Sequence, residues 1–415
     1  MATGADHAAH VARARAWWDA LGPGPKYAVG PMVDHSELPF RLLCRRHGAT
    51  LAYTPMLHAA QFATSRKVRA RAFDGWPAAP SAAPGGADRP LLVQFAGCDA
   101  ATILAAARHV EGCVDGVDLN FGCPQRIAHR GAYGAFLLER DWEWLVGLVR
   151  EVACGLRVPL SVKLRLVMDE RGEPSTARTV ELCTRLERAG VALIALHGRT
   201  RLQINRLQRA ADWAAIAAVK RALAIPLLAN GGIYTRADVV ACLRATGADG
   251  VMAAEGLLED PALFGTAEVA RELLAAEYLQ LAREHPPNSL RPVRAHLFEL
   301  LHADVGAHPR LCARLRAARS FEQLEEGAAE LIAARAARRR GLAGVRDGIE
   351  GSWYHRHRAL QASDGTELEE GCAAEAGPGA GLEAETETVG ERESERDACG
   401  APHREEASEC GVQVD

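Results

Sequence analysis

The sequence lacks several features that would place it in a membrane or a secreted class. The apolar run Ala222–Thr235 is closed by Arg221 and Arg236, so it falls short of the roughly 18 apolar residues that a membrane-spanning helix requires. The 11 cysteines are scattered, without a Cys-x-x-Cys pair. This distribution argues against a disulfide framework or a metal site and favours a reducing, cytoplasmic location. We therefore expect an intracellular protein that involves neither a membrane nor a metal.

Lysine is scarce, and the charge that is present is unevenly distributed. Only four lysines occur among 49 basic residues, which face 53 acidic residues, and the formal net charge is −4. Residues 361–415 contain 16 of the acidic and 3 of the basic side chains, which leaves residues 1–360 with a net charge of +9. A cationic body suits a polyanionic partner. The composition therefore predicts an anionic partner and, in the acidic tail, a disordered segment.

Short β-type runs alternate with alanine-rich helical stretches between residues 27 and 258. Eight strands are predicted, at Tyr27–Val33, Leu51–Tyr53, Leu91–Phe95, Gly116–Leu119, Leu160–Leu166, Leu193–His197, Pro226–Ala229 and Gly250–Ala253. Helices are predicted between them, at Leu38–His47, Ala100–Val110, Asp141–Cys154, Thr179–Ala189, Asp212–Leu223 and Arg236–Thr246. Eight βαβ units in about 230 residues match an α/β fold, a closed (β/α)8 TIM barrel, with an open doubly wound sheet as the alternative.

The pattern divides the chain into four predicted parts. Residues 1–26 form an N-terminal extension, and residues 27–258 form the barrel. Residues 259–346 are predicted to form an all-α helical domain, rich in arginine, because the pattern after Asp260-Pro261 is wholly helical. Residues 347–415 form the acidic tail, which we expect to be disordered.

Polar or glycine-rich residues follow directly after several predicted strands. In a TIM barrel these strand ends converge on the C-terminal rim, where active sites are built. Cys123 lies in such a segment, between Gly122 and Pro124, where its thiol is accessible and can donate a proton at neutral pH. A nucleophilic thiolate and a small buried hydrophobic side chain are the alternatives.

Lys163 lies in an apolar predicted strand, with Val162 and Leu164 on one face and Lys163 and Arg165 on the other. In a barrel strand that second face is the interior. A buried, unpaired ammonium group is costly, so Lys163 is expected to meet an anion or an electron-rich ring. The alternative is a structural ion pair with an inner carboxylate such as Asp118.

Two glycine-containing turns and one basic segment complete the predicted rim. Asn230-Gly231-Gly232 follows the seventh strand and Ala254-Glu255-Gly256 follows the eighth, where many barrels bind a cofactor phosphate through backbone N–H groups. Ordinary turns are the alternative, since turns use glycine constantly. His197 ends the sixth strand and Arg199 and Arg201 follow it, where they could orient a phosphate or a polyanionic substrate. The alternative is a solvated loop whose basic side chains pair with nearby acidic residues.

These motifs, in this order, resemble the tRNA-dihydrouridine synthases, flavoproteins that reduce uridine in tRNA. The matching segments are Gly30-Pro31-Met32-Val33-Asp34 with Leu38-Pro39-Phe40-Arg41, Asp118-Leu119-Asn120-Phe121-Gly122-Cys123-Pro124-Gln125, and His197-Gly198-Arg199-Thr200. The run from Cys123 to Leu137 is most similar to the eukaryotic branch that acts on D-loop positions 16 and 17. The loop at residues 203–209 departs from the family pattern, which usually has a lysine and glycines there.

The resemblance implies roles for individual residues. It implies FMN binding by residues from several strand ends, namely Pro31, Met32, Val33, Gln94, Lys163, His197, Asn230, Gly231, Gly232, Ala254 and Glu255. It implies that Cys123 is the general acid. Substrate contacts are expected from Asn120 and Arg165, at the target uracil, and from Arg199.

The reaction that the resemblance implies is an FMN-dependent reduction. NADPH or NADH reduces the flavin, which passes hydride to uracil C6 while the Cys123 thiol protonates C5. The target base must leave its stack to enter the pocket, and the arginine-rich helical domain is expected to grip tRNA phosphates. We expect a monomer. Two other functions stay open: a flavin-dependent barrel reductase of a small pyrimidine or enone, and a catalytically silent tRNA-binding protein.

Overall fold

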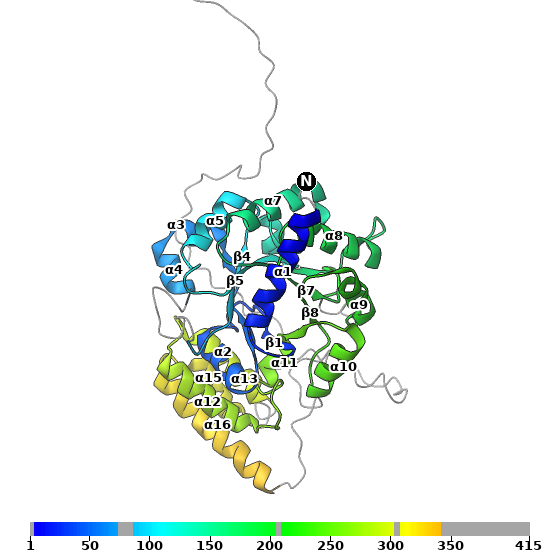
Figure 1. Ribbon diagram of the computed structural model, residues 1–415. Coiled ribbons are helices and arrows are strands. Elements are labelled where there is room, and N and C mark those ends of the chain that lie inside the picture. The colour runs from blue at the N-terminus through cyan, green and yellow to red at the C-terminus, as the bar shows by residue number, and fades with distance from the viewer. Residues whose placement is uncertain (1–3, 74–85, 205–208, 303–307, 342–415) are drawn as a thin grey trace, which may run out of the picture. The chain divides into compact units, whose positions relative to one another are not determined.

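The computed structural model describes residues 4–73, 86–204, 209–302 and 308–341 (Figure 1). The predicted acidic tail, residues 347–415, lies outside the described residues. Within the described ranges, no helix is long and apolar enough to cross a membrane.

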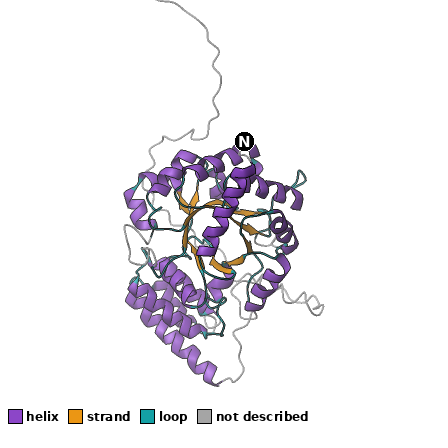
Figure 2. Cartoon of the chain, in the orientation of Figure 1, coloured by secondary structure: helices purple, strands orange, loops and turns teal. Residues whose placement is uncertain are grey.

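Eight parallel strands close into a barrel, which confirms the predicted TIM-barrel fold (Figure 2). In barrel order they are β1 (Lys26–Val29), β2 (Leu51–Tyr53), β4 (Leu91–Ala96), β5 (Gly116–Phe121), β6 (Leu160–Arg165), β7 (Leu193–His197), β8 (Leu227–Asn230) and β9 (Gly250–Ala253). The ring closes because β1 pairs with both β2 and β9, while β2 also pairs with β4. A short strand, β3 (Leu57–His58), adds to β4. The alternative of an open sheet is therefore wrong.

The first strand is shorter than predicted. It ends at Val29, before Gly30-Pro31, because proline has no N–H group to donate to the ladder. The chain then turns, and the amides of His35 and Ser36 both donate to the Met32 carbonyl oxygen, at 3.2 and 3.1 Å. This segment, predicted as the end of a strand, is therefore a loop at the barrel rim.

The barrel interior has an apolar layer and a polar layer. Side chains alternate along each strand, so every second residue points inward. The apolar layer consists of Ala28, Leu51, Tyr53, Leu92, Leu193, Ala195, Leu228 and Met252, packed with Trp18. The polar layer lies on β4, β5 and β6, where the register places Gln94 beside Asp118, and Asp118 beside Ser161. Lys163 is the next inward residue of β6, so the polar side chains are concentrated on three adjacent strands.

Helices surround the barrel (Figure 2). Polar side chains cap the N-termini of most of the larger ones. The larger helices are α2 (Leu38–Arg46), α5 (Ala100–Arg108), α7 (Trp142–Gly155), α8 (Thr176–Arg188), α9 (Trp213–Ala222) and α10 (Arg236–Thr246). The side chains of Asp99, Asp141, Ser175, Asp212 and Thr235 accept hydrogen bonds from first-turn amides of α5, α7, α8, α9 and α10, in that order. Each cap pairs N–H groups that a helix leaves free, so it fixes where the helix begins. Shorter elements are α3 (Ala59–Thr64), α4 (Arg66–Ala72), α6 (Arg126–Arg130), η2 (Gly134–Glu139) and α11 (Glu255–Glu259).

The N-terminal segment, predicted only as an extension, contains a helix that closes one end of the barrel. α1 (Gly4–Ala20) crosses the barrel opening in Figure 1. Trp18 is 4% exposed and packs against the apolar interior layer. Arg15 Nη1 donates to Asp249 Oδ1 at 2.8 Å, and Trp17 Nε1 donates to the Asp115 carbonyl oxygen at 3.1 Å. Because these aspartates directly precede β9 and β5, α1 covers the N-terminal ends of the strands.

A helical region follows the barrel, as predicted, and packs against α2. Its helices are α12 (Arg271–Glu284), α13 (Leu290–Leu300), α15 (Pro309–Ala317) and α16 (Phe321–Gly341). α12 contacts α2 and α16, and α13 contacts α11 at the barrel rim. Apolar residues of this region, such as Leu274, Val293 and Leu324, are fully buried in the same core cluster as barrel residues. The helical region is therefore anchored on the side of the barrel where the chain leaves β1 and β9.

A buried polar cluster joins the barrel to the helical region. Glu37, directly before α2, accepts a hydrogen bond from Tyr278 Oη at 2.7 Å and meets His296 Nε2 at 3.1 Å through its other carboxylate oxygen. His35, in the same loop, pairs with Glu299 at 3.2 Å. Burial alone would raise the pKa of Glu37, but the charge of His296 and hydrogen bonds from His296 and Tyr278 lower it. We call these five side chains the barrel–helix cluster.

Candidate active site

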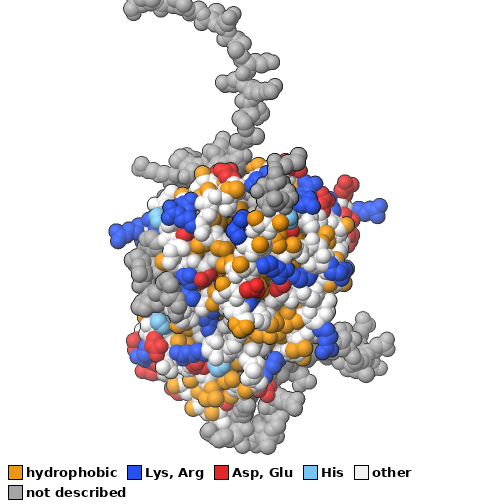
Figure 3. Space-filling view, in the orientation of Figure 1, with side chains coloured by type: hydrophobic (Ala, Val, Ile, Leu, Met, Phe, Trp, Pro, Cys, Tyr) orange, Lys and Arg blue, Asp and Glu red, His pale blue; other side chains and the backbone are white. Residues whose placement is uncertain are grey.

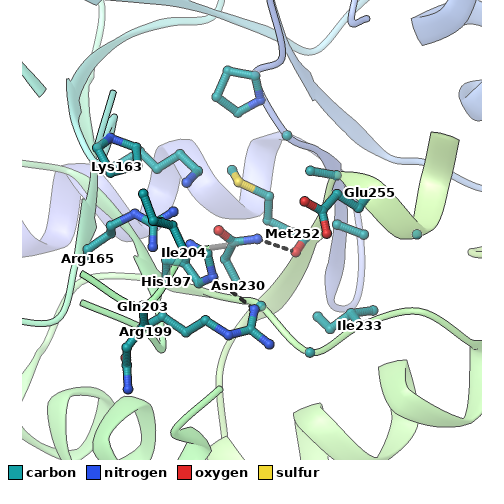
Figure 4. Close-up of a pocket in the computed structure, with 18 of the residues that line it drawn as sticks. Lys163, Arg165, His197, Arg199, Gln203, Ile204, Asn230, Ile233, Met252 and Glu255 are labelled. Atoms are coloured by element: carbon teal, nitrogen blue, oxygen red, sulfur yellow. Dashed lines mark hydrogen bonds between the residues drawn. The ribbon is translucent and has the colours of Figure 1, made fainter. Parts of the chain in front are cut away.

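A cavity of about 430 Å³ opens at the C-terminal ends of the barrel strands (Figure 4). Its lining comes from the loops or ends of β1, β5, β6, β7, β8 and β9. Most of the predicted site residues line it: Pro31, Cys123, Lys163, Arg165, His197, Arg199, Asn230, Gly231, Gly232, Ala254 and Glu255. Met32, Val33, Gln94 and Asn120 do not belong to the lining. Val33 is 55% exposed in the loop after β1, and Gln94 is 1% exposed in the polar layer.

Sequence reasoning missed several residues that line the cavity. Gln203 and Ile204 come from the loop that departs from the family pattern, and Tyr234 follows the glycine turn of β8. Met252 is an inward residue of β9, so strand alternation is the signal that could have found it. No local pattern identifies Tyr234, whose hydroxyl accepts a hydrogen bond from Arg199 Nη2 at 3.1 Å.

The loop that carries Cys123 is fixed by hydrogen bonds to its backbone. Asn120 Oδ1 accepts from the amides of Gly122 and Cys123, at 3.0 and 2.9 Å. Arg165 Nε donates to the Gly122 carbonyl oxygen at 2.8 Å. The Ala135 amide donates to the Cys123 carbonyl oxygen at 3.0 Å. Asn120 and Arg165, which the resemblance assigned to the substrate, thus hold the loop that presents the half-buried thiol.

Lys163 extends from β6 into the cavity (Figure 4). Burial and the positive charge of Arg165 lower its pKa to about 8, against the opposing effect of Asp118 and Cys123. Within the described part of the chain, Lys163 forms no ion pair at 4.0 Å or less. Asp118, the alternative partner, instead accepts a hydrogen bond from Gln94 Nε2 at 2.8 Å. The ammonium group therefore lines the cavity without an ion-pair partner among the described residues.

Positive charge gathers on one side of the cavity. Burial, together with the charges of Arg165, Lys163 and Arg199, lowers the pKa of His197 well below its usual range. The imidazole is therefore neutral at physiological pH. Arg199 Nη1 lies 3.3 Å from His197 Nε2, and the two side chains meet at the lower part of Figure 4. One neutral imidazole among three cationic side chains gives the cavity a potential that suits an anion.

The turns after β8 and β9 contain three glycines that a residue with a side chain could replace only with a clash or with backbone strain. Gly231 has a φ angle of +100°, and a Cβ atom there would lie 2.6 Å from His197 Cδ2. Gly232 also has a positive φ angle, +74°. A Cβ atom at Gly256 would lie 2.5 Å from the Ile233 carbonyl oxygen. These glycines line the cavity without side chains, so the backbone itself forms the wall there, an arrangement that is typical of phosphate sites. We call Gly231, Gly232 and Gly256 the glycine cradle.

Fold and site together define a class of protein. A closed barrel with a cationic, glycine-lined cavity at its C-terminal rim is a (β/α)8-barrel scaffold whose cavity has a charge that suits an anionic ligand. Across the residues that the structure describes, no group of three or more His, Cys, Asp or Glu side chains is placed to hold a metal ion. The chain belongs to the dihydrouridine synthase (Dus) family, whose family model matches residues 28–332.

Curated relatives agree with this assignment. A Rattus norvegicus protein named tRNA-dihydrouridine(16/17) synthase NAD(P)(+)-like is 42% identical over 308 residues, which are 74% of this chain and 66% of that protein. The Mus musculus protein of the same name is also 42% identical, over 74% of this chain and 61% of that protein. The tRNA-dihydrouridine(16/17) synthase of Saccharomyces cerevisiae is 37% identical over 75% of this chain and 74% of that protein. The chain thus spans 61% to 66% of the two rodent relatives.

Proposed function

We propose that this chain reduces uridine to 5,6-dihydrouridine in the D-loop of tRNA, at positions 16/17, with bound FMN and with NADPH or NADH as the reductant. One observation carries the proposal: Cys123, Lys163 and the glycine cradle line a single cavity. The relatives named tRNA-dihydrouridine(16/17) synthase support this substrate and the use of NAD(P). We expect the enzyme to act as a monomer in the cytoplasm.

The size and lining of the cavity support FMN as its ligand. Its volume of about 430 Å³ lies within the roughly 300–1,000 Å³ of ligand pockets. The glycine cradle with Arg199 suits the phosphate, and Lys163 supplies a positive charge for the ring. When bound, the flavin would supply the hydride for uracil C6. Gln94 has both amide atoms engaged, with Asp118 and Asn120, so its predicted contact with the flavin would use its second N–H.

Residues of this chain would donate the proton and stabilise the negative charge that develops in the cavity. Cys123, on a loop with fixed backbone, would donate a proton to uracil C5 as general acid. Lys163 has a pKa of about 8, so it keeps its proton at neutral pH and would stabilise negative charge that develops in the cavity. His197, being neutral, would serve as a hydrogen-bonding group rather than as a cation.

Only some of the arginines in the helical region could bind tRNA phosphates, because others already form ion pairs within the protein. Ion pairs engage Arg283 with Glu325, Arg314 with Glu330, and Arg335 with Glu272. Arg310, Arg316 and Arg319, on or just after α15, are exposed, and no carboxylate among the described residues pairs with them. We call them the α15 arginines. On the face shown in Figure 3, basic and acidic side chains are interspersed. Because the α15 arginines are exposed and have no paired carboxylate among the described residues, they are the candidates for binding tRNA phosphates.

Replacing the three α15 arginines by glutamine is expected to weaken tRNA binding and to flatten its dependence on salt. Each lost phosphate contact should reduce the slope of log K against log salt by about 0.7–0.9. Filter binding of full-length protein at several salt concentrations measures both quantities. Arg283→Gln is the matched control, because its guanidinium group already pairs with Glu325. Equal affinity for the triple variant and the wild type at every salt concentration would place the tRNA elsewhere.

Mass spectrometry of tRNA that has been incubated with the full-length protein and NADPH tests the proposed function. The purified protein should have a flavin absorption spectrum, and the product should carry two added hydrogens at position 16 or 17. Free uridine is the comparison substrate, because a reductase of small pyrimidines would reduce it and the proposed enzyme would not. A colourless protein that also fails to take up FMN, or tRNA binding without product, would overturn the proposal.

A further inference from the structure

Asp118 is a buried carboxyl group that no step of the proposed reaction uses. It is fully buried in the polar layer of the barrel, and it does not line the cavity. Burial raises its pKa to about 7, although the side chains of Ser161 and Gln94, which hydrogen-bond to it, and the charge of Lys163 act in the other direction. Burying a carboxyl group is costly unless it is hydrogen-bonded. The contacts that Asp118 makes should therefore explain why it is there.

A chain of hydrogen bonds leads from Asp118 to the loop that carries Cys123. Gln94 Nε2 donates to Asp118 Oδ2 at 2.8 Å. Asn120 Nδ2 donates to Gln94 Oε1 at 2.8 Å. Asn120 Oδ1 then accepts from the amides of Gly122 and Cys123, at 3.0 and 2.9 Å. Two side-chain amides thus connect the buried carboxyl group to the backbone of the reactive cysteine.

The acceptor oxygen of Asp118 determines which atoms of the Gln94 and Asn120 amide groups face each partner. Asp118 Oδ2 is the acceptor here, so Gln94 turns its NH2 group toward Asp118 and its carbonyl oxygen toward Asn120. That oxygen selects the NH2 group of Asn120, which leaves the Asn120 carbonyl oxygen for the loop amides. We propose that Asp118 is a positioning residue that fixes the Cys123 loop through Gln94 and Asn120. The catalytic use of the loop rests on the proposed function, whereas the positioning itself does not.

Two substitutions separate this role from a direct effect of charge on Lys163. Asp118→Ala removes the acceptor and should lower kcat for dihydrouridine formation by about tenfold, while KM for tRNA stays within about twofold. Asp118→Asn keeps an acceptor oxygen but removes the charge, and it should stay within about threefold of the wild-type kcat. If Asp118 acted through its charge, Asp118→Asn would be as impaired as Asp118→Ala. That outcome overturns the proposal.

Alkylation of Cys123 tests the positioning without any assay of activity. In full-length, flavin-loaded protein, the rate of Cys123 modification by iodoacetamide, followed by peptide mass spectrometry, should rise about threefold or more in Asp118→Ala, because the loop loses its anchor. It should stay at the wild-type rate in Asp118→Asn. Asp249→Ala is the matched control, since it removes a carboxylate at the opposite end of the barrel. An unchanged alkylation rate in Asp118→Ala refutes the positioning role even if the variant reduces tRNA more slowly.

A double-mutant cycle shows whether Asp118 acts through Asn120. Asn120→Ala removes the last link, so it should raise the alkylation rate at Cys123 as Asp118→Ala does. The double variant should then react no faster than Asn120→Ala alone, because residues in one hydrogen-bond chain are not additive. If the double variant reacted faster by the product of the two single fold-changes, Asp118 and Asn120 would act independently, and the proposed route would be overturned. Gln94→Leu breaks the same chain at its middle link and replaces Asp118→Ala in these measurements if that variant does not fold.

Discussion

Replacing Cys123 by alanine is expected to slow dihydrouridine formation by about 10²–10⁴-fold, the usual contribution of a general acid. The thiol lines the cavity together with Lys163, on a loop whose backbone is held by Asn120, Arg165 and Ala135. The variant should keep its flavin and its affinity for tRNA, because neither the glycine cradle nor the α15 arginines are altered. Single-turnover assays with excess enzyme and mass spectrometry of the tRNA measure the rate.

Cys113→Ala is the matched control for this substitution. Cys113 is also a half-buried free cysteine, but it precedes β5, whereas Cys123 follows it. The control should therefore keep its rate within about twofold. Cys123→Ser retains a hydroxyl group in place of the thiol and should be intermediate, since a hydroxyl is a weaker acid. A Cys123→Ala enzyme as fast as Cys113→Ala would remove Cys123 from its proposed role.

The barrel could be predicted from the sequence because its strands are buried on both faces. Such strands form short apolar runs, and the predicted bounds of Leu193–His197 and Gly250–Ala253 coincide with β7 and β9. The role of α1 could not be predicted in the same way. Trp18 is an ordinary aromatic residue in the sequence, and what buries it is the opening of the barrel, which exists only after the strands have closed.

In the candidate site, too, residues could be predicted from the local sequence, whereas their contacts with distant segments could not. The motif around Cys123 and the inward face of β6 are local, so both cavity residues could be identified from spacing alone. The hydrogen-bond partners of Asn120 and Arg165 could not be predicted from the sequence. Arg165 Nη1 donates to the Thr200 carbonyl oxygen at 3.0 Å, in the loop after the neighbouring strand. Strand alternation gives the face of a side chain, whereas its partner depends on how two loops meet.

The barrel–helix cluster is the most distant of these contacts. Glu37 is separated by 241 residues from Tyr278 and by 259 residues from His296. In the sequence Glu37 is an acidic residue just before a helix, which is a common surface pattern. Its burial at 5% exposure follows only when the helical region packs against α2. The cluster therefore gives a direct test of how strongly the two regions depend on each other.

Replacing Glu37 by alanine is expected to lower the free energy of unfolding by about 3–5 kcal/mol, the cost of breaking a buried pair by removing one partner. The Tyr278 hydroxyl loses its acceptor, and His296 loses the carboxylate at 3.1 Å. Urea unfolding of the full-length protein measures the change. Glu277→Ala is the matched control, because Glu277 pairs with His47 and Arg46 across the same interface but is 26% exposed. Its loss should cost less than about 1 kcal/mol.

Two spectroscopic probes show where the stability is lost. Residues 259–346 contain no tryptophan, and six of the seven tryptophans of the chain precede them. Tryptophan fluorescence of a Trp353→Phe background therefore follows the barrel and its N-terminal helix, while far-ultraviolet circular dichroism follows all helices. In Glu37→Ala the circular dichroism transition should begin at lower urea than the fluorescence transition, because the helical region loses its buried anchor while the barrel keeps its closed sheet. A Glu37→Ala protein with the same midpoint as Glu277→Ala, by both probes, would show that the cluster does not hold the helical region to the barrel.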